Sequence, residues 1–150
     1  FVFDPGQAMP MFNGEELRHF IELATWVTVN DYEGKMLCER TGWSEAEISR
    51  KVKGLVVTLG GDGSVVLDGT ADDPEHRIQR IAPVRVKAVD TTGCGDSFMG
   101  TVLAGLASGM TLSQSAELAS YVSAYAATGY GAQASYGTAA QIREAFADAE

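Results

Sequence analysis

A near-continuous apolar run in the middle of the chain, Leu55–Leu59, constrains the fold most strongly. Strands that lack polar alternation are typical of parallel sheets, because helices cover both faces of such sheets. Strand and helix patterns alternate before this run, with strands at Phe1–Asp4 and Trp26–Val29 and helices over 15–24 and 31–40. This alternation predicts an α/β fold with three layers and a doubly wound, mostly parallel sheet.

Capping and spacing signals indicate the remaining elements. Ser44, followed three residues later by Glu47, has the pattern of a capping box and predicts a third helix. From Asp90 onward apolar residues recur at helical spacing, which predicts two long helices and a closing helix over 138–147. Shorter strands are expected at Val65–Leu67, His76–Ile81 and Val84–Val86.

Composition limits the classes of partner and compartment. The length of 150 residues suits a single domain over 1–150. Twenty Asp and Glu against eleven Lys and Arg give a net charge of −9, which argues against nucleic acid and anionic membranes as partners. No apolar run approaches the roughly 20 residues that span a bilayer. Two isolated cysteines, Cys38 and Cys94, argue against a disulfide framework or zinc site and favour the reducing cytoplasm.

One string carries most of the chemical information: Asp90-Thr91-Thr92-Gly93-Cys94-Gly95-Asp96, at the start of a long predicted helix. Its glycines let the backbone turn sharply and let a ligand approach closely. The N–H groups of Gly93, Cys94 and Gly95 have no partner within the helix, so with the helix dipole they can stabilise charge on a transferring phosphoryl group. Asp96, in the first helical turn, can accept a proton from an attacking hydroxyl.

Two other interpretations of this string are open. Asp96 could simply cap the helix while the glycines turn the chain. Cys94 could be a nucleophile, although no His or second Cys lies near it in sequence. Neither a P-loop pattern nor a Gly-x-Ser-x-Gly elbow occurs in the chain.

The string resembles the Asp-Thr-x-Gly-Ala-Gly-Asp signature of the ribokinase, or phosphofructokinase-B, family of carbohydrate and nucleoside kinases, with Cys94 in place of the usual Ala. Asn30-Asp31-Tyr32-Glu33 is similar to the family's Asn-x-x-Glu, which implies that Asn30 and Glu33 hold phosphate and the waters of Mg²⁺. Alone, this motif could be a capping Asn with a solvated Glu. Asp4-Pro5-Gly6 matches the strand end that opens the C-terminal half of such kinases.

Two loops extend the resemblance. Val57–Gly63 is similar to the family's strand-to-loop segment that contacts ATP, although Gly-Gly-Asp-Gly is also favourable hairpin chemistry. The implied nucleotide contacts in this segment are Thr58, Gly60, Gly61 and Gly63.

Gly131–Ser135 resembles the late loop of ribokinases, which implies a monovalent cation site, with K⁺ as the candidate ion. The implied metal ligands are Glu33 for Mg²⁺ and Asp90, Thr92, Gly131 and Ser135 for K⁺. The helix that carries Ser120 and Ala124, with Tyr121 and Tyr125, could wall an adenine pocket or belong to the core.

The resemblance implies an ATP-dependent kinase that phosphorylates a primary hydroxyl of a sugar or nucleoside, with ribose or adenosine favoured. It implies Asp96 as the base, with Gly93, Cys94 and Gly95 as the anion site. The chain opens in mid-strand without Met, and family members are longer, so we expect an upstream half that supplies the lid, the sugar contacts and a surface for a homodimer. The rival hypotheses are a nucleotide-binding fragment or pseudoenzyme without turnover, and an interaction domain without ligand.

Overall fold

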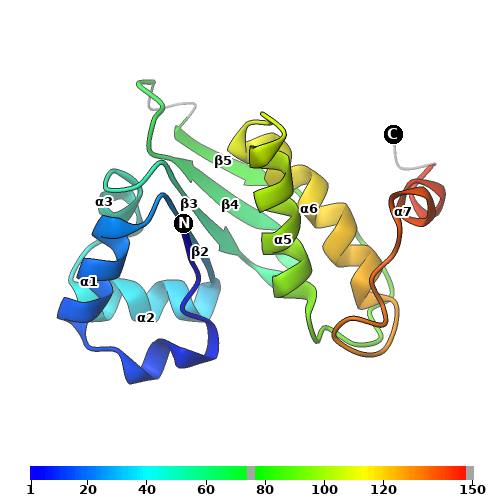
Figure 1. The fold of residues 1–150 in the computed structure, drawn as a ribbon, viewed down its shortest axis with the longest axis horizontal. Helices are drawn as coiled ribbons and strands as arrows, with labels where there is room; N and C mark the ends of the chain where they lie inside the picture. Colours follow the sequence, from blue (N-terminus) through cyan, green and yellow to red (C-terminus); the bar gives the residue numbers. More distant parts are fainter. Residues whose placement is uncertain (74–76, 148–150) are drawn as a thin grey trace. The chain divides into compact units, whose positions relative to one another are not determined.

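The computed structural model describes residues 1–73 and 77–147, which form two compact units, Phe1–Ile81 and Ala82–Glu150. The first unit is built on a five-stranded sheet (Figure 1). The strands lie in sequence order across the sheet: β1 (Val2–Phe3), β2 (Trp26–Asn30), β3 (Gly54–Thr58), β4 (Ser64–Asp68) and β5 (Ile78–Ile81).

Half of this sheet is parallel and half antiparallel. β1, β2 and β3 pair in parallel, because helices carry the chain back between them. β3, β4 and β5 pair antiparallel, and only the short 3₁₀ turn η2 (Gly60–Asp62) joins β3 to β4. The predicted α/β fold is therefore confirmed, but the sheet is mixed and not mostly parallel.

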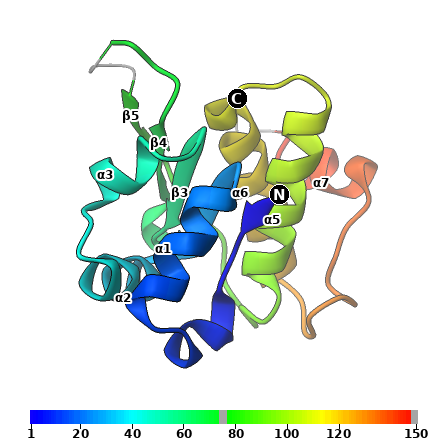
Figure 2. The same cartoon turned by 60° about the vertical axis from the view of Figure 1, so that its left-hand side comes forward.

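The core of the first unit lies between the sheet and its helices. The helices are α1 (Gly14–Leu23), α2 (Asp31–Thr41) and α3 (Glu45–Ser49), after the 3₁₀ segment η1 (Gly6–Met11). They lie on one side of the sheet (Figures 1 and 2). Alternate strand residues and the apolar helix residues make up this core: Phe3, Val27, Val29, Leu55, Val57 and Leu67 from the strands, and Leu17, Ile21, Leu37 and Ile48 from the helices.

The second unit is helical. α5 (Cys94–Ala107) and α6 (Leu112–Ala127) run side by side, followed by α7 (Ala139–Ala145). The two long helices approach closely at Gly105, where an added Cβ would lie 2.4 Å from the Ser115 hydroxyl. Phe98 and Val102 are buried on α5, as are Ala116 and Ala119 on α6. The three helices predicted beyond Asp90 are thus confirmed.

The predicted strand at Val84–Val86 is wrong, because residues 82–92 form neither strand nor helix. Pro83 cannot donate a hydrogen bond to a strand partner. Further along, the Val89 N–H donates to the Ala127 carbonyl at 2.7 Å, at the end of the second unit's own helix, and not to a strand. The strand predicted over His76–Ile81 is observed from Ile78, and His76 lies outside the described residues.

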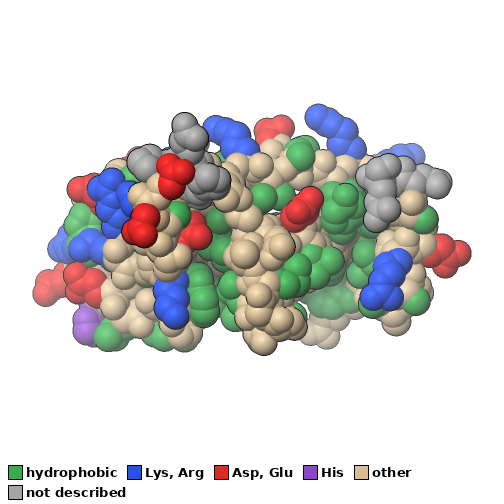
Figure 3. Space-filling view, turned by 90° about the horizontal axis from the view of Figure 1, so that it is seen from above, with side chains coloured by type: hydrophobic (Ala, Val, Ile, Leu, Met, Phe, Trp, Pro, Cys, Tyr) green, Lys and Arg blue, Asp and Glu red, His purple; other side chains and the backbone are tan. Residues whose placement is uncertain are grey.

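Charged side chains are interspersed on the surface. On the face shown in Figure 3, Lys and Arg groups lie among Asp and Glu groups and do not gather into one basic patch. Across residues 1–73 and 77–147, no helix combines the length and the apolar character that crossing a membrane requires.

Candidate functional site

The start of α5 differs from the other helix starts. Every other α-helix that the structure describes begins at a capping box, in which a side chain accepts a hydrogen bond from a first-turn N–H; these caps are Asn13, Asn30, Ser44, Thr111 and Thr138. α5 begins at Gly93, in the left-handed region with φ +79°, and no side chain caps it. The first-turn N–H groups of α5 are therefore open to an outside acceptor.

The hydrogen bonds at this start show which N–H groups remain available. The Cys94 N–H donates to the Thr91 carbonyl at 3.1 Å, and the helical ladder starts with the Ser97 N–H donating to the Gly93 carbonyl at 2.9 Å. Within the described part of the chain, neither the Gly93 nor the Gly95 N–H has a backbone acceptor. Two of the three predicted anion-site donors are thus open, and the third closes a local turn.

There is also room for a ligand beside these donors. An added Cβ at Gly95 would meet no atom within 4 Å, so its outer side faces open space. Asp96, the next residue, is exposed in the first turn. Open donors and an unfilled approach to the backbone suit a phosphate group, because the positive end of a helix dipole favours an anion there. The adjacent Asp96 carboxylate is a proton acceptor beside that position.

Asp90 ties this turn to the loop before α7. Its carboxylate accepts hydrogen bonds from the Thr92 N–H at 2.9 Å and from the Gly131 N–H at 3.0 Å. The Gly131 bond is the largest of the three causes that lower the pKa of Asp90, before the backbone and side-chain bonds from Thr92, so the group is a carboxylate at neutral pH. The Ser135 hydroxyl donates to the Gly131 carbonyl at 2.7 Å. The structure therefore brings together Asp90 and the late loop, as the resemblance implied.

The oxygen atoms that this region presents come from the Asp90 carboxylate, the Ser135 hydroxyl and the Gly131 carbonyl. Among the described residues, no group of three or more His, Cys, Asp or Glu side chains could hold a metal ion. A K⁺ ion here would rely on backbone carbonyls, on the Ser135 hydroxyl and on the Asp90 carboxylate. Thr92 is exposed, and both its N–H and its side chain interact with the Asp90 carboxylate.

Cys94 is held inside the second unit. Its thiol donates to the Ser123 carbonyl at 3.6 Å, while the Ser123 hydroxyl donates to the Cys94 carbonyl at 3.1 Å. Burial is the first cause that raises the pKa of Cys94, and the nearby Asp90 adds to it. A protonated, partly buried thiol is a poor nucleophile, so this geometry disfavours the interpretation of Cys94 as a covalent catalyst.

Two contacts of this turn could not be found from the sequence. Ser123 lies 29 residues from Cys94, and Tyr136 donates its hydroxyl to the Gly93 carbonyl, 43 residues away, at 3.1 Å. Neither residue belongs to a local motif. Such contacts depend on how α5, α6 and the late loop pack against one another. The spacing of residues within one short segment does not predict that packing.

In the first unit, Asn30 and Glu33 form the capping box of α2. The Asn30 side chain accepts from the Glu33 N–H at 2.8 Å, and the Glu33 carboxylate accepts from the Asn30 N–H at 2.9 Å. Glu33 is only 8% exposed, so the alternative of a solvated Glu is wrong while the capping Asn is confirmed. Part of their hydrogen-bonding capacity is thus used within α2.

The ends of β2 and β3 bring two predicted nucleotide contacts side by side. Asn30 and Thr58 are register partners in the parallel ladder, and the Thr58 hydroxyl lies 3.5 Å from the Val29 carbonyl. The loop beyond Thr58 is also a hairpin turn, since Gly63 accepts a bond from the Leu59 N–H at 2.8 Å. Added Cβ atoms at Gly60 and Gly61 would meet nothing within 4 Å, which leaves this loop open to a ligand.

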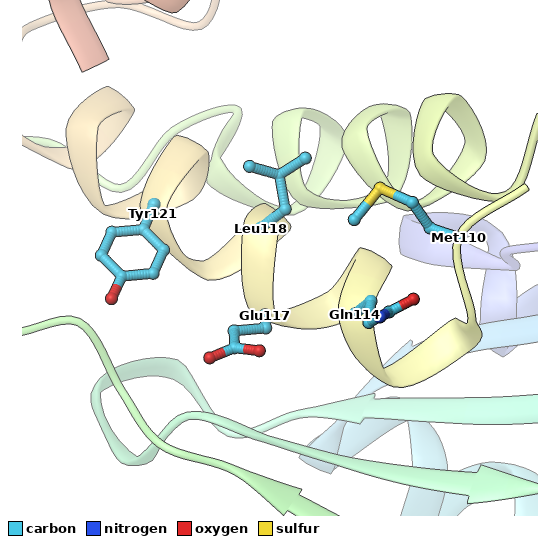
Figure 4. A pocket seen from close by; sticks show the side chains of 5 residues that line it. All are labelled: Met110, Gln114, Glu117, Leu118 and Tyr121. Atoms are coloured by element: carbon cyan, nitrogen blue, oxygen red, sulfur yellow. The ribbon is translucent and has the colours of Figure 1, made fainter. Parts of the chain in front are cut away.

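The α6 residues assigned to the nucleotide differ in accessibility. Ser120 is partly buried and bonds back to the Ala116 carbonyl at 3.0 Å, whereas Ala124 is buried, with 9% exposed. A separate pocket on the second unit lies along α6 and the turn before it (Figure 4). Its lining consists of Met110, Gln114, Glu117, Leu118 and Tyr121. Of the residues considered for the adenine site, only Tyr121 lines it.

Comparison with known proteins identifies the family of the chain. The model of the pfkB family of carbohydrate kinases matches residues 2–139. The ribokinase of Lactococcus lactis subsp. lactis (strain IL1403) is 33% identical over 113 residues, which is 75% of this chain and 35% of that protein. The nucleoside kinase of Burkholderia thailandensis in complex with inosine superposes with a TM-score of 0.89 at 40% identity, over 99% of this chain and 48% of that one.

The same Burkholderia nucleoside kinase, in complex with ADP-inosine, gives a TM-score of 0.90 at 41% identity over 99% of this chain. This chain covers 45% of that structure, so it spans about half the length of the solved kinases and about a third of the Lactococcus ribokinase. The match to the family model covers nearly the whole chain. The chain belongs to the pfkB family of carbohydrate kinases.

Proposed function

We propose that residues 1–150 form the nucleotide-binding part, within one domain, of a kinase that transfers phosphate from ATP to a primary hydroxyl of a nucleoside or sugar. One observation carries the proposal: α5 starts without a side-chain cap, beside open space and next to Asp96. Membership of a carbohydrate kinase family supports it.

In the proposed reaction, the hydroxyl oxygen of the acceptor forms a bond to the γ-phosphorus of ATP while the bond to the ADP oxygen breaks. Asp96 takes the hydroxyl proton as the general base. The open N–H groups at Gly93 and Gly95 stabilise charge on the transferring group, and rigid positioning supplies the rest. Mg²⁺, when bound with ATP, would neutralise phosphate charge, and Glu33 is the residue that we assign to its hydration shell.

For the acceptor we favour a nucleoside, with ribose second. The Burkholderia nucleoside kinase that was solved with inosine is 40% identical over 99% of this chain, and a relative named ribokinase is 33% identical over 75% of it. A panel of nucleosides and sugars, tested for ATP consumption with a protein of full family length that contains this chain, would identify the acceptor. No consumption with any member of the panel would overturn the proposed activity.

A second candidate is a nucleotide-binding protein without turnover, because the proposed phosphate contacts would hold a nucleotide whether or not phosphate is transferred. Its first test is the intact mass of the natural protein. A mass near the 15.9 kDa of this chain favours the second candidate, and a mass near that of the relatives favours the kinase. We also propose a cytoplasmic location and a homodimer that forms through a lid. Both proposals concern the full-length natural protein and not this chain alone.

We expect this chain alone to bind Mg-ATP or ADP weakly but measurably, because the proposed phosphate contacts all lie within it. Titration calorimetry at millimolar nucleotide, on a sample shown to be folded by circular dichroism, measures this. Gly95→Ala is the control, since its methyl group would occupy the open space beside the phosphate donors. Absence of any heat of binding from the folded wild-type chain would contradict the assignment.

We expect K⁺ to raise the activity of the full-length kinase several-fold over Na⁺. The reason is the pairing of Asp90 with the loop at Gly131 and Ser135, which offers carbonyl, hydroxyl and carboxylate oxygens. Initial rates in matched KCl and NaCl buffers measure the effect. Asp90→Asn should reduce the difference between the two salts, and equal wild-type rates in both would refute the cation site.

A further inference from the structure

The late loop contacts the start of α5 through a tyrosine. The Tyr136 hydroxyl donates to the Gly93 carbonyl at 3.1 Å, and this carbonyl also accepts the first helical bond, from the Ser97 N–H at 2.9 Å. The carbonyl belongs to the Gly93–Cys94 peptide group. This peptide group lies between the two open donors, the Gly93 N–H and the Gly95 N–H. Because a peptide group is planar, a bond that fixes its carbonyl also fixes the backbone plane between these donors.

Two further contacts hold the same loop against the same turn. The Gly131 N–H donates to the Asp90 carboxylate at 3.0 Å. Gly93 packs so closely on Ala132 that an added Cβ would lie 2.5 Å from the Ala132 carbonyl oxygen. The loop over 131–136 therefore crosses the turn at its beginning and at its end, and Tyr136 supplies the contact nearest α5.

Tyr136 also lies within electrostatic reach of the proposed base. Partial burial, the charge of Asp96 and that of Cys94 raise its pKa, in that order of size. The phenol is therefore protonated at neutral pH and remains a hydrogen-bond donor. The residue is 42% exposed, so it does not belong to the buried core, and removing its hydroxyl leaves that core intact.

We propose that Tyr136 is a positioning residue of the phosphotransfer site: by holding the Gly93 carbonyl, it orients the first turn of α5, with its N–H donors and Asp96, toward the transferring phosphoryl group. This inference rests on the proposed function. It assigns Tyr136 no contact with the reacting atoms. It gives a role to the hydrogen bond between the late loop and the Gly93 carbonyl.

The test is Tyr136→Phe in a kinase of full family length that contains this chain, with Tyr130→Phe as the matched control. Tyr130 lies in the same loop region and is 78% exposed. One hydrogen bond is worth about 0.5–1.5 kcal/mol net, so kcat should fall about threefold to tenfold while the KM for the acceptor stays unchanged. Tyr130→Phe should keep the wild-type kcat. Rates are measured well below the Tm of each variant, so a small loss of stability cannot lower kcat.

An unchanged kcat in Tyr136→Phe, with active wild type, would overturn the positioning role and leave the proposed function intact. A second readout does not need activity. In amide ¹H–¹⁵N spectra, Tyr136→Phe should shift the Cys94 and Gly95 resonances, and Tyr130→Phe should leave them in place. If wild type transfers no phosphate, the proposed function fails, and unshifted resonances would additionally show that the tyrosine does not hold this turn.

Discussion

Asp96→Asn should lower kcat at least about a hundredfold in a kinase of full family length, while the affinity for ATP stays nearly unchanged. Asparagine keeps the size and hydrogen bonding of the side chain but cannot take the proton of the acceptor hydroxyl. A general base contributes typically about 10²–10⁴-fold to the rate. Steady-state kinetics and nucleotide titration on the same preparation separate the two quantities.

Stability is the control for this variant. A carboxylate in the first turn of a helix interacts favourably with the helix dipole by typically ~0.3–1 kcal/mol, so its loss should shift the Tm by only a few degrees. A folded Asp96→Asn protein with near-normal turnover would show that the residue only stabilises the helix start. That outcome would make us withdraw Asp96 as the base.

Gly93→Ala should both destabilise the protein and abolish phosphate transfer. Alanine at φ +79° costs roughly 1–2 kcal/mol from backbone strain alone. The new Cβ would also lie 2.5 Å from the Ala132 carbonyl oxygen and 2.9 Å from its Cα, so the loop would have to move away from the turn. Thermal unfolding and initial rates measure the two effects.

Gly95→Ala is the matched comparison, because it adds the same methyl group two residues later. Gly95 has no positive φ, and its Cβ would meet no atom within 4 Å. Alanine is favoured over glycine in a helix by up to about 1 kcal/mol, so this variant should be at least as stable as wild type. It should still lose activity, because the methyl group occupies the approach to the phosphate donors. Wild-type activity in Gly95→Ala would argue against a phosphate at this turn.

The sequence was sufficient for the fold class, because the patterns that indicate it are local, whereas the position of the site stays a prediction. The apolar run at β3 and the helical spacing beyond Asp90 each depend on one segment, and the structure confirms both. The mixed sheet was harder to predict from the sequence. It follows from the short turn at Gly60–Asp62, whose residues are typical both of a nucleotide-binding loop and of a hairpin.

What the sequence missed depends on contacts between distant segments. The error at Val84–Val86 arose because an alternating pattern cannot show whether a strand partner exists. Ser123 and Tyr136 reach the site only through the packing of α5, α6 and the late loop. The capping role of Asn30 was visible in the sequence, but the burial of Glu33 was not, since burial is a property of the assembled unit.

The uncapped start of α5 has a consequence for amide exchange with solvent. Side chains shield first-turn N–H groups at the other helix starts that the structure describes, whereas the Gly95 N–H has neither a side-chain cap nor a backbone acceptor there. In deuterated water, this amide should exchange rapidly in the free protein. Bound nucleotide would accept its hydrogen bond and slow the exchange, so a single backbone position would report occupancy of the site without any measurement of turnover.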